Sequence, residues 1–462
     1  MNATPAAADP VHAAVAVLLR SLAAAPRSGA DPVRICVALS GGRDSMVLLD
    51  ALARLAPPRG FALGALHVHH GLSPHADAWT AFCAAECDRR GVPLVVVRVR
   101  IDRAAGESLE AAARAARHDA FARADADVVA LAHHADDQAE TLLLQLLRGA
   151  GPRGLAAMGA RHSRAGAPAL VRPLLALPRV AIEACAAAFA VEWIDDESNA
   201  DTRLKRNYLR HEIAPRLAAA FPGYPATFVR AAALQAEAAS LLDDLAALDA
   251  GAAVAGDAEG GGTLDQAMLA ALSPPRARNL LRGFLRGHGL PAPSMARLAA
   301  MLAQLVGAAP DARVRLAHAG VELGLHRGRI LVHARPVAPY TIAWRGESAL
   351  ALPHGILEWV PAIGTGIAAG ALAAAPVVVR RREGGERIRL AAGRPRQALK
   401  GLLQQASMPT WERAALPLVF CGDALAAVPG VGIDVAFQAG PGAEGYAVHW
   451  RPRAPDARAA TG

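Results

Sequence analysis

The chain has 462 residues, of which 53% are hydrophobic and 19% are charged. This length exceeds what one compact core usually holds, so two or three domains are expected, and the composition excludes a disordered chain. The net charge of +8 favours polyanionic partners. Because all but two of the 49 basic residues are arginine, the arginine excess alone is weak evidence for RNA binding.

Five cysteines are scattered along the chain, and no two of them have the two-residue spacing of zinc or redox sites. They are Cys36, Cys83, Cys87, Cys185 and Cys421. This usage favours a reduced, cytoplasmic protein. Arg20 interrupts the apolar run near the N-terminus, so we expect no signal peptide. Prolines and glycines interrupt the uncharged stretch Trp359–Val379, so we expect neither a transmembrane helix nor a membrane partner.

From Asp31 to about Trp193, short β-branched runs alternate with longer helical patterns. The predicted strands are Val33–Leu39, Ala62–His69, Leu94–Val99, Val128–Ala132 and Val191–Ile194. This rhythm predicts an α/β domain with a doubly wound, mostly parallel sheet. Ligands of such sheets bind at the carboxyl ends of the strands.

Downstream, the patterns predict a helical middle domain and then a small mixed α/β domain. The expected boundaries are 1–30 for an N-terminal extension, 31–225 for the catalytic domain, 226–335 for the middle domain, 336–375 for a linker and 376–452 for the C-terminal domain. Helices are expected over Ala231–Ala247 and Arg276–Gly287. The glycine-rich segment Gly251–Gly262 is expected to be an exposed loop.

The turn Ser40-Gly41-Gly42-Arg43-Asp44-Ser45 lies between a predicted strand and an apolar helix. Adjacent glycines free the backbone, the helix start supplies N–H groups, and the serines add hydroxyl donors, so the turn is suited to an anion. It is not a Walker loop, because both lysines of the chain follow leucine. The motif resembles the loop of pyrophosphatase-loop ATPases, which hold the pyrophosphate end of ATP and release AMP and pyrophosphate.

Histidines and acids follow two other predicted strands. In His133-His134-Ala135-Asp136-Asp137-Gln138-Ala139-Glu140-Thr141, the residues His133, Asp137 and Glu140 have the spacing of one helical face. His67 and His69 lie on one side of their strand. A transition-metal site is an alternative, although no ligand spacing supports it. The acids alternatively serve only to stabilise the start of a helix.

Together these motifs resemble, in order, those of the bacterial tRNA(Ile)-lysidine synthetases. The same order continues with Arg148-Gly149-Ala150-Gly151, Arg172-Pro173-Leu174-Leu175, Trp193-Ile194-Asp195-Asp196-Glu197-Ser198-Asn199 and Arg206-Asn207-Tyr208-Leu209-Arg210. Near the C-terminus, Arg382-Glu383-Gly384-Gly385-Glu386-Arg387, Leu399-Lys400-Gly401-Leu402-Leu403-Gln404-Gln405 and Pro409-Thr410-Trp411-Glu412-Arg413 resemble the tRNA-binding domain of that family. The resemblance covers both ends of the chain and is loose in the middle.

The resemblance implies that ATP adenylates the C2 oxygen of the wobble cytidine in the CAU anticodon of tRNA(Ile). Free L-lysine then displaces AMP to give lysidine. It implies ATP binding by Ser40, Gly41, Gly42, Arg43, Asp44, Ser45, His67 and His69, with Mg²⁺ on Asp44. It implies lysine binding by Asp137 and Glu140, and a catalytic set of Asp44, His133, Asp137 and Glu140. The sequence does not decide which acid is the general base.

Basic residues supply candidates for tRNA contacts. In the catalytic domain they are Arg114, Arg117, Arg148, Lys205, Arg206 and Arg210, and in the C-terminal domain they are Arg380, Arg381, Arg382 and Lys400. The span from Arg380 to Lys400 carries eight basic residues against two glutamates, which favours an RNA-facing surface over a merely solvated one. A homodimer is left open.

Three other functions compete with this interpretation. A tRNA cytidine thiolase on the same fold would use a cysteine pair or an iron–sulfur cluster, and Cys83 and Cys87 are the nearest pair. A related amidotransferase would need a nucleophilic cysteine, and the first thirty residues contain none. The third is a non-catalytic tRNA-binding protein with a degenerate nucleotide site. Lysine-dependent release of AMP would separate these alternatives.

Overall fold

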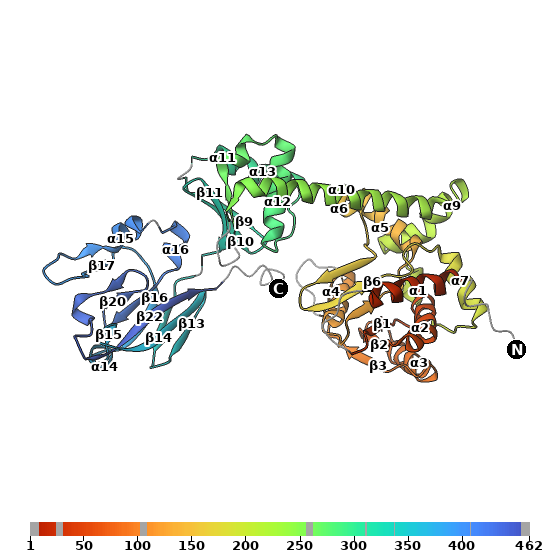
Figure 1. The fold of residues 1–462 in the computed structure, drawn as a ribbon, viewed down its shortest axis with the longest axis horizontal. Coiled ribbons are helices and arrows are strands. Elements are labelled where there is room, and N and C mark those ends of the chain that lie inside the picture. The colour runs from red at the N-terminus through yellow and green to blue at the C-terminus, as the bar shows by residue number, and fades with distance from the viewer. Residues whose placement is uncertain are drawn as a thin grey trace. The chain divides into compact units, whose positions relative to one another are not determined.

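The structure is a computed structural model that describes residues 9–24, 31–101, 109–255, 262–309, 312–336, 338–406 and 408–453. The chain divides into two compact units, Met1–Leu241 and Leu242–Gly462 (Figure 1). Each unit has its own hydrophobic clusters and is described by itself.

The first unit contains a sheet with the strand order β3-β2-β1-β4-β6-β5. Its strands are β1 (Arg34–Ala38), β2 (Ala62–His69), β3 (Leu94–Arg98), β4 (Val128–Ala130), β5 (Arg161–Arg164) and β6 (Ala167–Val171). All neighbouring pairs are parallel except β5 with β6, and Val37 of β1 is in register with Ala65 and Ala130 on either side. The predicted doubly wound, mostly parallel fold is therefore confirmed.

One predicted strand is absent, and two observed strands, β5 and β6, were not predicted. Residues Val191–Ile194 form no strand, and the Ile194 N–H instead donates to the Gly41 carbonyl at 2.9 Å. The parallel strand that the sequence did not predict is β6, whose sequence contains Pro168 and few β-branched residues. Such a sequence gives a weak strand signal, because proline removes a donor and propensity depends on the surrounding sheet.

Helices cover both faces of this sheet, as the continuous burial of Ile35, Cys36 and Val37 in β1 requires. They are α1 (Pro10–Ala23), α2 (Arg43–Leu55), α3 (Ala76–Arg89), α4 (Leu109–Ala122), α5 (Ala135–Leu147) and α7 (Arg179–Ala188). Ile35 and Val37 belong to the core under α1, α2, α3 and α7. Cys36 faces the other core, to which α4 contributes Ala120 and Phe121. The carboxyl edge of the sheet is left open for loops.

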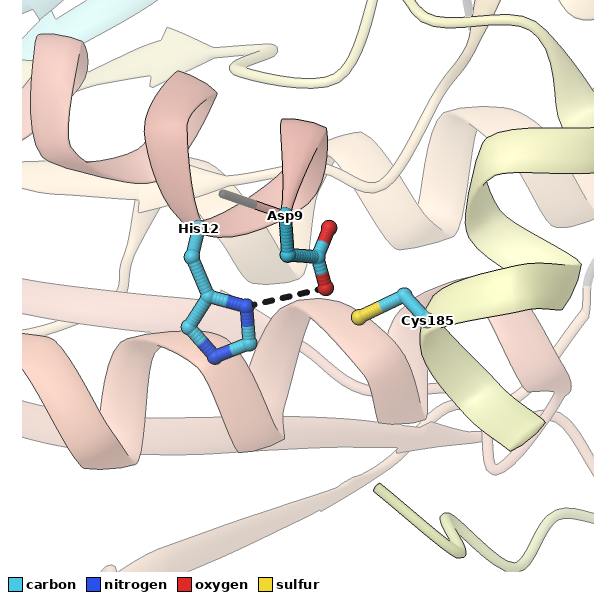
Figure 2. Close-up of side chains that lie close together, drawn as sticks. All are labelled: Asp9, His12 and Cys185. Atoms are coloured by element: carbon cyan, nitrogen blue, oxygen red, sulfur yellow. Dashed lines mark hydrogen bonds and ion pairs between the residues drawn. The ribbon is translucent and has the colours of Figure 1, made fainter. Parts of the chain in front are cut away.

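The segment expected as an N-terminal extension contains α1, and its residues Val11 and Val15 are fully buried in the core of the first unit. Asp9 caps this helix, because its Oδ1 accepts the Val11 N–H at 2.8 Å. Asp9 Oδ2 pairs with His12 Nδ1 at 3.2 Å, and Cys185 of α7 faces the same carboxylate (Figure 2). Burial, followed by Asp9, raises the pKa of the Cys185 thiol. This polar group joins α1 to α7.

Asp9, His12 and Cys185 are also the only three potential metal ligands that lie within 4.8 Å of one another among the described residues. Both carboxylate oxygens of Asp9 are already engaged, Oδ1 by the N–H of Val11 and Oδ2 by His12 Nδ1. The transition-metal alternative considered for His67, His69 and His133 finds no such cluster in the described part of the chain.

The first unit ends in helical segments that lead into a long helix. These are α6 (Pro152–Leu155), α8 (Lys205–Tyr208), a π-helical turn over Leu209–Ile213, α9 (Ala214–Ala220) and α10 (Tyr224–Ala253). The expected helix over Ala231–Ala247 lies inside α10, and the boundary between the units falls within that helix. Of the expected loop Gly251–Gly262, residues 251–255 belong to α10 and β7, and residues 256–261 are outside the described residues.

The second unit begins with a helical region, as predicted, which also contains an unexpected antiparallel sheet. Its helices are α11 (Gln266–Ala271), α12 (Pro274–Gly287) and α13 (Met295–Gly307). The sheet has the order β7-β8-β11-β10-β9, with β7 (Val254–Ala255), β8 (Thr263–Asp265), β9 (Arg315–His318), β10 (Val321–His326) and β11 (Arg329–Ala334). Leu280 and Leu323 are buried in the core between the helices and this sheet.

The C-terminal part is rich in strands. One sheet has the order β12-β16-β19-β20-β21 and the other β13-β14-β22-β15. The bounds are β12 (Thr341–Trp344), β13 (Ala349–Leu352), β14 (Gly355–Ile363), β15 (Ile367–Ala368), α14 (Ala369–Ala374), β16 (Val377–Arg381), β17 (Arg387–Ile388), β18 (Gln397–Ala398), α15 (Leu399–Gln405), α16 (Thr410–Ala415), β19 (Pro417–Cys421), β20 (Ala424–Val428), β21 (Gly432–Ile433) and β22 (Glu444–Pro452).

The segment predicted as a linker, 336–375, instead supplies β12 to β15 and α14. Trp359 of β14 and Val379 of β16 are buried in one core. Alternating burial along β14 explains why this uncharged stretch folds as strands. No helix among the described residues is long and apolar enough to cross a membrane.

Candidate active site

The serine-glycine turn joins β1 to α2 at the carboxyl edge of the sheet. Gly41 has φ of +86°, and an added Cβ would lie 3.0 Å from Ile194 Cδ1 and 3.1 Å from Cys83 Sγ. Glycine is therefore required at this position. Gly42 has φ of −72° and room for a Cβ, so only one of the two glycines is needed for the backbone conformation.

The hydroxyl groups of the turn hold it in shape. Ser45 Oγ donates to the Gly42 carbonyl at 2.8 Å, and the Ser40 N–H donates to Ser45 Oγ at 3.2 Å. Ser45 is buried, whereas Ser40 is exposed. Ser45 thus stabilises the turn from inside, and Ser40 is the hydroxyl that an anion can reach.

The two histidines of β2 have different surroundings. His67 is buried and donates through Nδ1 to the Leu39 carbonyl at 2.9 Å, which supports the turn from the neighbouring strand. Burial lowers the pKa of His67, so it is neutral at physiological pH. His69 lies 3.2 Å from Asp77 instead and also contacts Arg98.

Arg43 and Asp44 begin α2 and are partly buried. Arg43 Nη1 lies 2.7 Å from Glu183 Oε1 on α7, and Arg43 Nε lies 3.2 Å from Asp44 Oδ1. Asp44 Oδ2 is 3.5 Å from His134 Nε2. Burial opposes ionisation of Asp44, but His134 and Arg43 hold the pKa of its carboxyl below the usual value. Asp44 is therefore anionic.

His134 lies among three carboxylates and was missed by the sequence analysis. Its Nε2 is 3.5 Å from both Asp44 Oδ2 and Asp137 Oδ2, and its Nδ1 is 3.6 Å from Asp136 Oδ2. Burial opposes its charge, but the surrounding acids raise the pKa of His134 to about 10. His134 is thus an imidazolium ion at neutral pH. The acids two and three positions later in the sequence were the available signal.

His133, which was predicted as catalytic, precedes α5 and does not lie on its face. Burial, and then Arg172 and Arg206 against the opposing effect of Asp137, lower the pKa of His133 to about 4. His133 is therefore neutral. Its Nδ1 is buried and has no hydrogen-bond partner.

The acids of α5 have further partners. Asp136 Oδ2 accepts the N–H of Arg179 at 2.9 Å and so stabilises the start of α7. Asp137 Oδ2 accepts the His134 N–H at 3.1 Å. Asp136 therefore has a structural role, whereas Asp137 faces the site.

Asp137 and Glu140 form an ion cluster with Arg206 and Arg210. Arg206 lies 2.7 Å from Glu140 and 2.9 Å from Asp137, and Arg210 lies at the same distances from these two acids. The side chains of Asp137 and Glu140 are 11% and 6% exposed, and those of both arginines are 25% exposed. The predicted lysine-binding acids and two predicted tRNA-binding arginines thus belong to one cluster.

The other residues predicted to contact RNA differ in their exposure and surroundings. Arg114, Arg117, Arg148, Lys205 and Lys400 are exposed. Arg380 lies over the Phe420 ring at 3.8 Å from its centre.

Arg382 Nε pairs with Glu386 at 3.2 Å, and Glu386 also accepts the N–H groups of Glu383 and Gly384. Arg382 therefore fastens a turn. A pocket of about 360 Å³ beside this turn is lined by Arg380, Arg381, Arg387 and Arg396.

A pocket of about 840 Å³ in the first unit is not at the serine-glycine turn. It lies against β1, β2, β3 and α4, and its lining extends from Arg34 and Ala62 at the amino ends of their strands to Arg98 at the carboxyl end of β3. The candidate active site is thus defined by its turn and charged cluster and not by this pocket.

Comparisons with known proteins identify three domains in the chain. Residues 15–217 match the family model described as a PP-loop domain, residues 264–331 match a TilS substrate binding domain, and residues 377–450 match a TilS substrate C-terminal domain. The first unit is therefore a PP-loop ATPase domain, which implies that the chain binds ATP.

Curated proteins of similar length extend this result. The chain is 43% identical to a tRNA(Ile)-lysidine synthase of Azoarcus sp. (strain BH72), over 95% of each chain. It is 42% identical to that of Nitrosomonas europaea, over 91% of this chain and 92% of the relative, and 43% identical to that of Aromatoleum aromaticum, over 94% and 100%. The chain belongs to the tRNA(Ile)-lysidine synthase family, as its motifs predicted.

Proposed function

We propose that the chain synthesises lysidine in tRNA(Ile). ATP adenylates the C2 oxygen of the wobble cytidine in the CAU anticodon and releases pyrophosphate. The ε-amine of L-lysine then attacks C2 and displaces AMP. The observation that carries this proposal is the preformed turn at Gly41 beside a charged cluster of Asp44, His134 and Asp137. Membership of the family supports the same reaction.

The turn is suited to the pyrophosphate end of ATP. Ser40 is exposed there, and the N-terminus of α2 directs free N–H groups toward the turn. Asp44 would hold Mg²⁺, because its carboxylate is 35% exposed, more than Asp136 at 26% or Asp137 at 11%. Magnesium usually takes one or two carboxylates together with substrate phosphates. When bound, the ion would neutralise phosphate charge.

The ammonium groups of lysine need carboxylates, and Asp137 and Glu140 are the ones at hand. Both are engaged by Arg206 and Arg210, so these arginines must release them before lysine binds. RNA phosphates are suitable partners for the released guanidinium groups. In this proposal RNA binding therefore opens the lysine site.

Attack by lysine also requires loss of a proton. With a reference pKa of about 10.4, only roughly one ε-amine in a thousand is unprotonated near pH 7. Asp137 or Glu140 would accept the proton as the new carbon–nitrogen bond forms. His134 is already protonated and instead stabilises the carboxylates around it. Neutral His133 would support Asp137 and Glu140 in this role.

The remaining assignments are part of the same proposal. His67 holds the turn that binds ATP, and the exposed Arg148, Lys205 and Lys400 contact tRNA. The cysteines in the described part of the chain are buried and unpaired, which supports the reduced cytoplasm as the compartment. A homodimer stays a prediction.

The test measures release of AMP and identifies the nucleoside produced. Wild-type protein is mixed with ATP, Mg²⁺, lysine and a transcript of tRNA(Ile) that carries CAU, and the digested RNA is analysed by mass spectrometry. We expect AMP and lysidine only when all components are present. A matched transcript with UAU should give neither. Sulfur incorporation would instead indicate the thiolase, and absence of AMP would indicate a binding protein.

A further inference from the structure

Helix α4 presents two exposed arginines at the open edge of the sheet. Arg114 and Arg117 are three residues apart and so lie on one side of the helix. Helix α4 connects β3 to β4, which run in the same direction in the sheet, so its first residues follow the carboxyl end of β3. The amino-terminal half of α4 is therefore directed toward the carboxyl edge, where the candidate active site lies.

Further cationic or polar groups occur at that edge. Arg172 directly follows β6, His70 follows β2, and His133 follows β4. Arg172 Nη1 donates to the Gly159 carbonyl at 2.8 Å, whereas its Nε is buried without a partner. The Nδ1 atoms of His70 and His133 are likewise buried without partners. The ends of β2, β4 and β6 thus bring side-chain nitrogen atoms without hydrogen-bond partners to the carboxyl edge of the sheet.

No acid in the described part of the chain forms an ion pair with Arg114, Arg117 or Arg172. In contrast, Arg206 and Arg210 nearby are each paired with two acids. Part of the chain's positive charge at this edge is therefore uncompensated, and an anionic ligand is the partner it lacks.

Electrostatic effects among these groups agree with the geometry. Although the Arg117 residue is exposed as a whole, protein atoms around its guanidinium and then Arg114 lower its pKa, and burial and then Arg114 lower the pKa of Arg172. Burial and then Arg117 lower the pKa of His70 to about 4. The pKa of His118 on α4 is lowered by burial and by the facing cations Arg114, Arg172, Arg117 and His162. In each case burial is the largest cause, and nearby positive groups are the second.

We propose that Arg114, Arg117 and Arg172 form a phosphate cradle that binds the RNA backbone beside the target cytidine. This proposal rests on the proposed function and adds Arg172 to the RNA contacts. Guanidinium groups bind phosphate oxygens through paired hydrogen bonds. RNA is favoured over ATP as the source of the phosphate, because Arg114 and Arg117 are exposed on a helix surface and the turn at Gly41 already suits the pyrophosphate.

The test compares two variants with a matched control. The variants are Arg114→Ala/Arg117→Ala and Arg172→Gln, and the control is Arg123→Ala, an exposed arginine just beyond the opposite end of α4. The tRNA dissociation constant is measured across a salt series without lysine, and ATP affinity is measured without RNA. The double variant should bind tRNA about tenfold or more weakly, with the logarithmic salt slope reduced by about two.

ATP affinity should be unchanged in all variants, and Arg123→Ala should keep the wild-type slope. An unchanged slope in the folded double variant would overturn the cradle. A loss of ATP affinity with normal tRNA binding would also overturn it and assign the cluster to the nucleotide. Failure of the wild type to form lysidine would refute the proposed function, while the salt slope would still report on the cradle.

Discussion

Arg206 Nε lies 2.7 Å from Glu140 Oε2, although 66 residues separate them in the chain. The contact holds an acid and a cation that we assign to different substrates. If RNA phosphates take the arginines and lysine takes the acids, removal of the acid should have opposite effects on the two substrates.

We expect Glu140→Gln to raise the KM for lysine at least tenfold, because it removes a charge that faces an ammonium. The same change should tighten tRNA binding severalfold, because Arg206 and Arg210 then lose a charged carboxylate partner and are freer to bind phosphate. Binding and steady-state assays measure both quantities. Glu212→Gln is the control, since Glu212 pairs with Arg216 in the same segment but outside the cluster. Weaker tRNA binding by the Glu140 variant would contradict the exchange of partners.

The two glycines of the turn should respond differently to alanine. Gly41→Ala forces a left-handed residue and a contact with Ile194, so the free energy of unfolding should fall by about 1–2 kcal/mol or more. Gly42→Ala should be close to neutral in stability, because its φ is −72°. Chemical denaturation measures both variants. Equal losses would mean that the turn has another conformation.

The adjacent histidines should give opposite pH dependences of stability. The pKa of His134, about 10 in the fold, exceeds its unfolded value of about 6.5. Its charge therefore stabilises the fold fully below about pH 6.5, and this contribution is lost as the pH rises toward 10. His133 has a pKa of about 4, so its contribution is present above about pH 6.5 and is lost as the pH falls toward 4.

Unfolding free energies of His134→Gln and His133→Gln, each compared with the wild type from pH 4 to pH 10, measure these contributions. The His134 difference should shrink at high pH and the His133 difference at low pH. Parallel curves for the two variants would show that the assigned charge states are wrong.

Asp44→Asn should lower turnover about a hundredfold or more, because it removes the proposed ligand of Mg²⁺. It should also raise the Mg²⁺ concentration needed for half-maximal activity. Thermal unfolding should change little, since the carboxylate is 35% exposed. Normal Mg²⁺ dependence of the residual activity would assign the metal to another acid.

In the C-terminal part, the exposed arginines should govern the salt dependence of tRNA binding. Arg394→Ala/Arg396→Ala should reduce the slope by about two. Arg382→Ala should act mainly on stability, because Arg382 is 17% exposed and pairs with Glu386. Affinity in a salt series, together with thermal unfolding, separates the two effects. A slope that responds only to Arg382 would place the RNA on the turn itself.

The sequence was sufficient for features that depend on neighbouring residues. The strand–turn–helix around Gly41 has a local signal, because an apolar strand, a glycine and an apolar helix follow one another directly. The order of motifs also identified the family. The burial of β1 on both faces followed from its continuous apolar run.

Long-range relationships could not be predicted in this way. The spacing of Arg206 and Arg210 indicated cations on one helical face, but not that the face meets acids of α5. His134 was passed over because a histidine followed by acids does not reveal that Asp44 approaches from another element. The strand β6 contains proline and acquires its conformation from its neighbours β4 and β5.

The close approach of Cys83 to Gly41 gives the turn a natural reporter. Burial, followed by Cys87, raises the pKa of the Cys83 thiol to about 12, so it is almost entirely in the unreactive thiol form in the folded protein. Alkylation of this cysteine therefore requires a local opening of the structure around the turn. The rate of its modification measures how often the turn opens, and a nucleotide that binds the closed turn should slow that rate without any change to the chain.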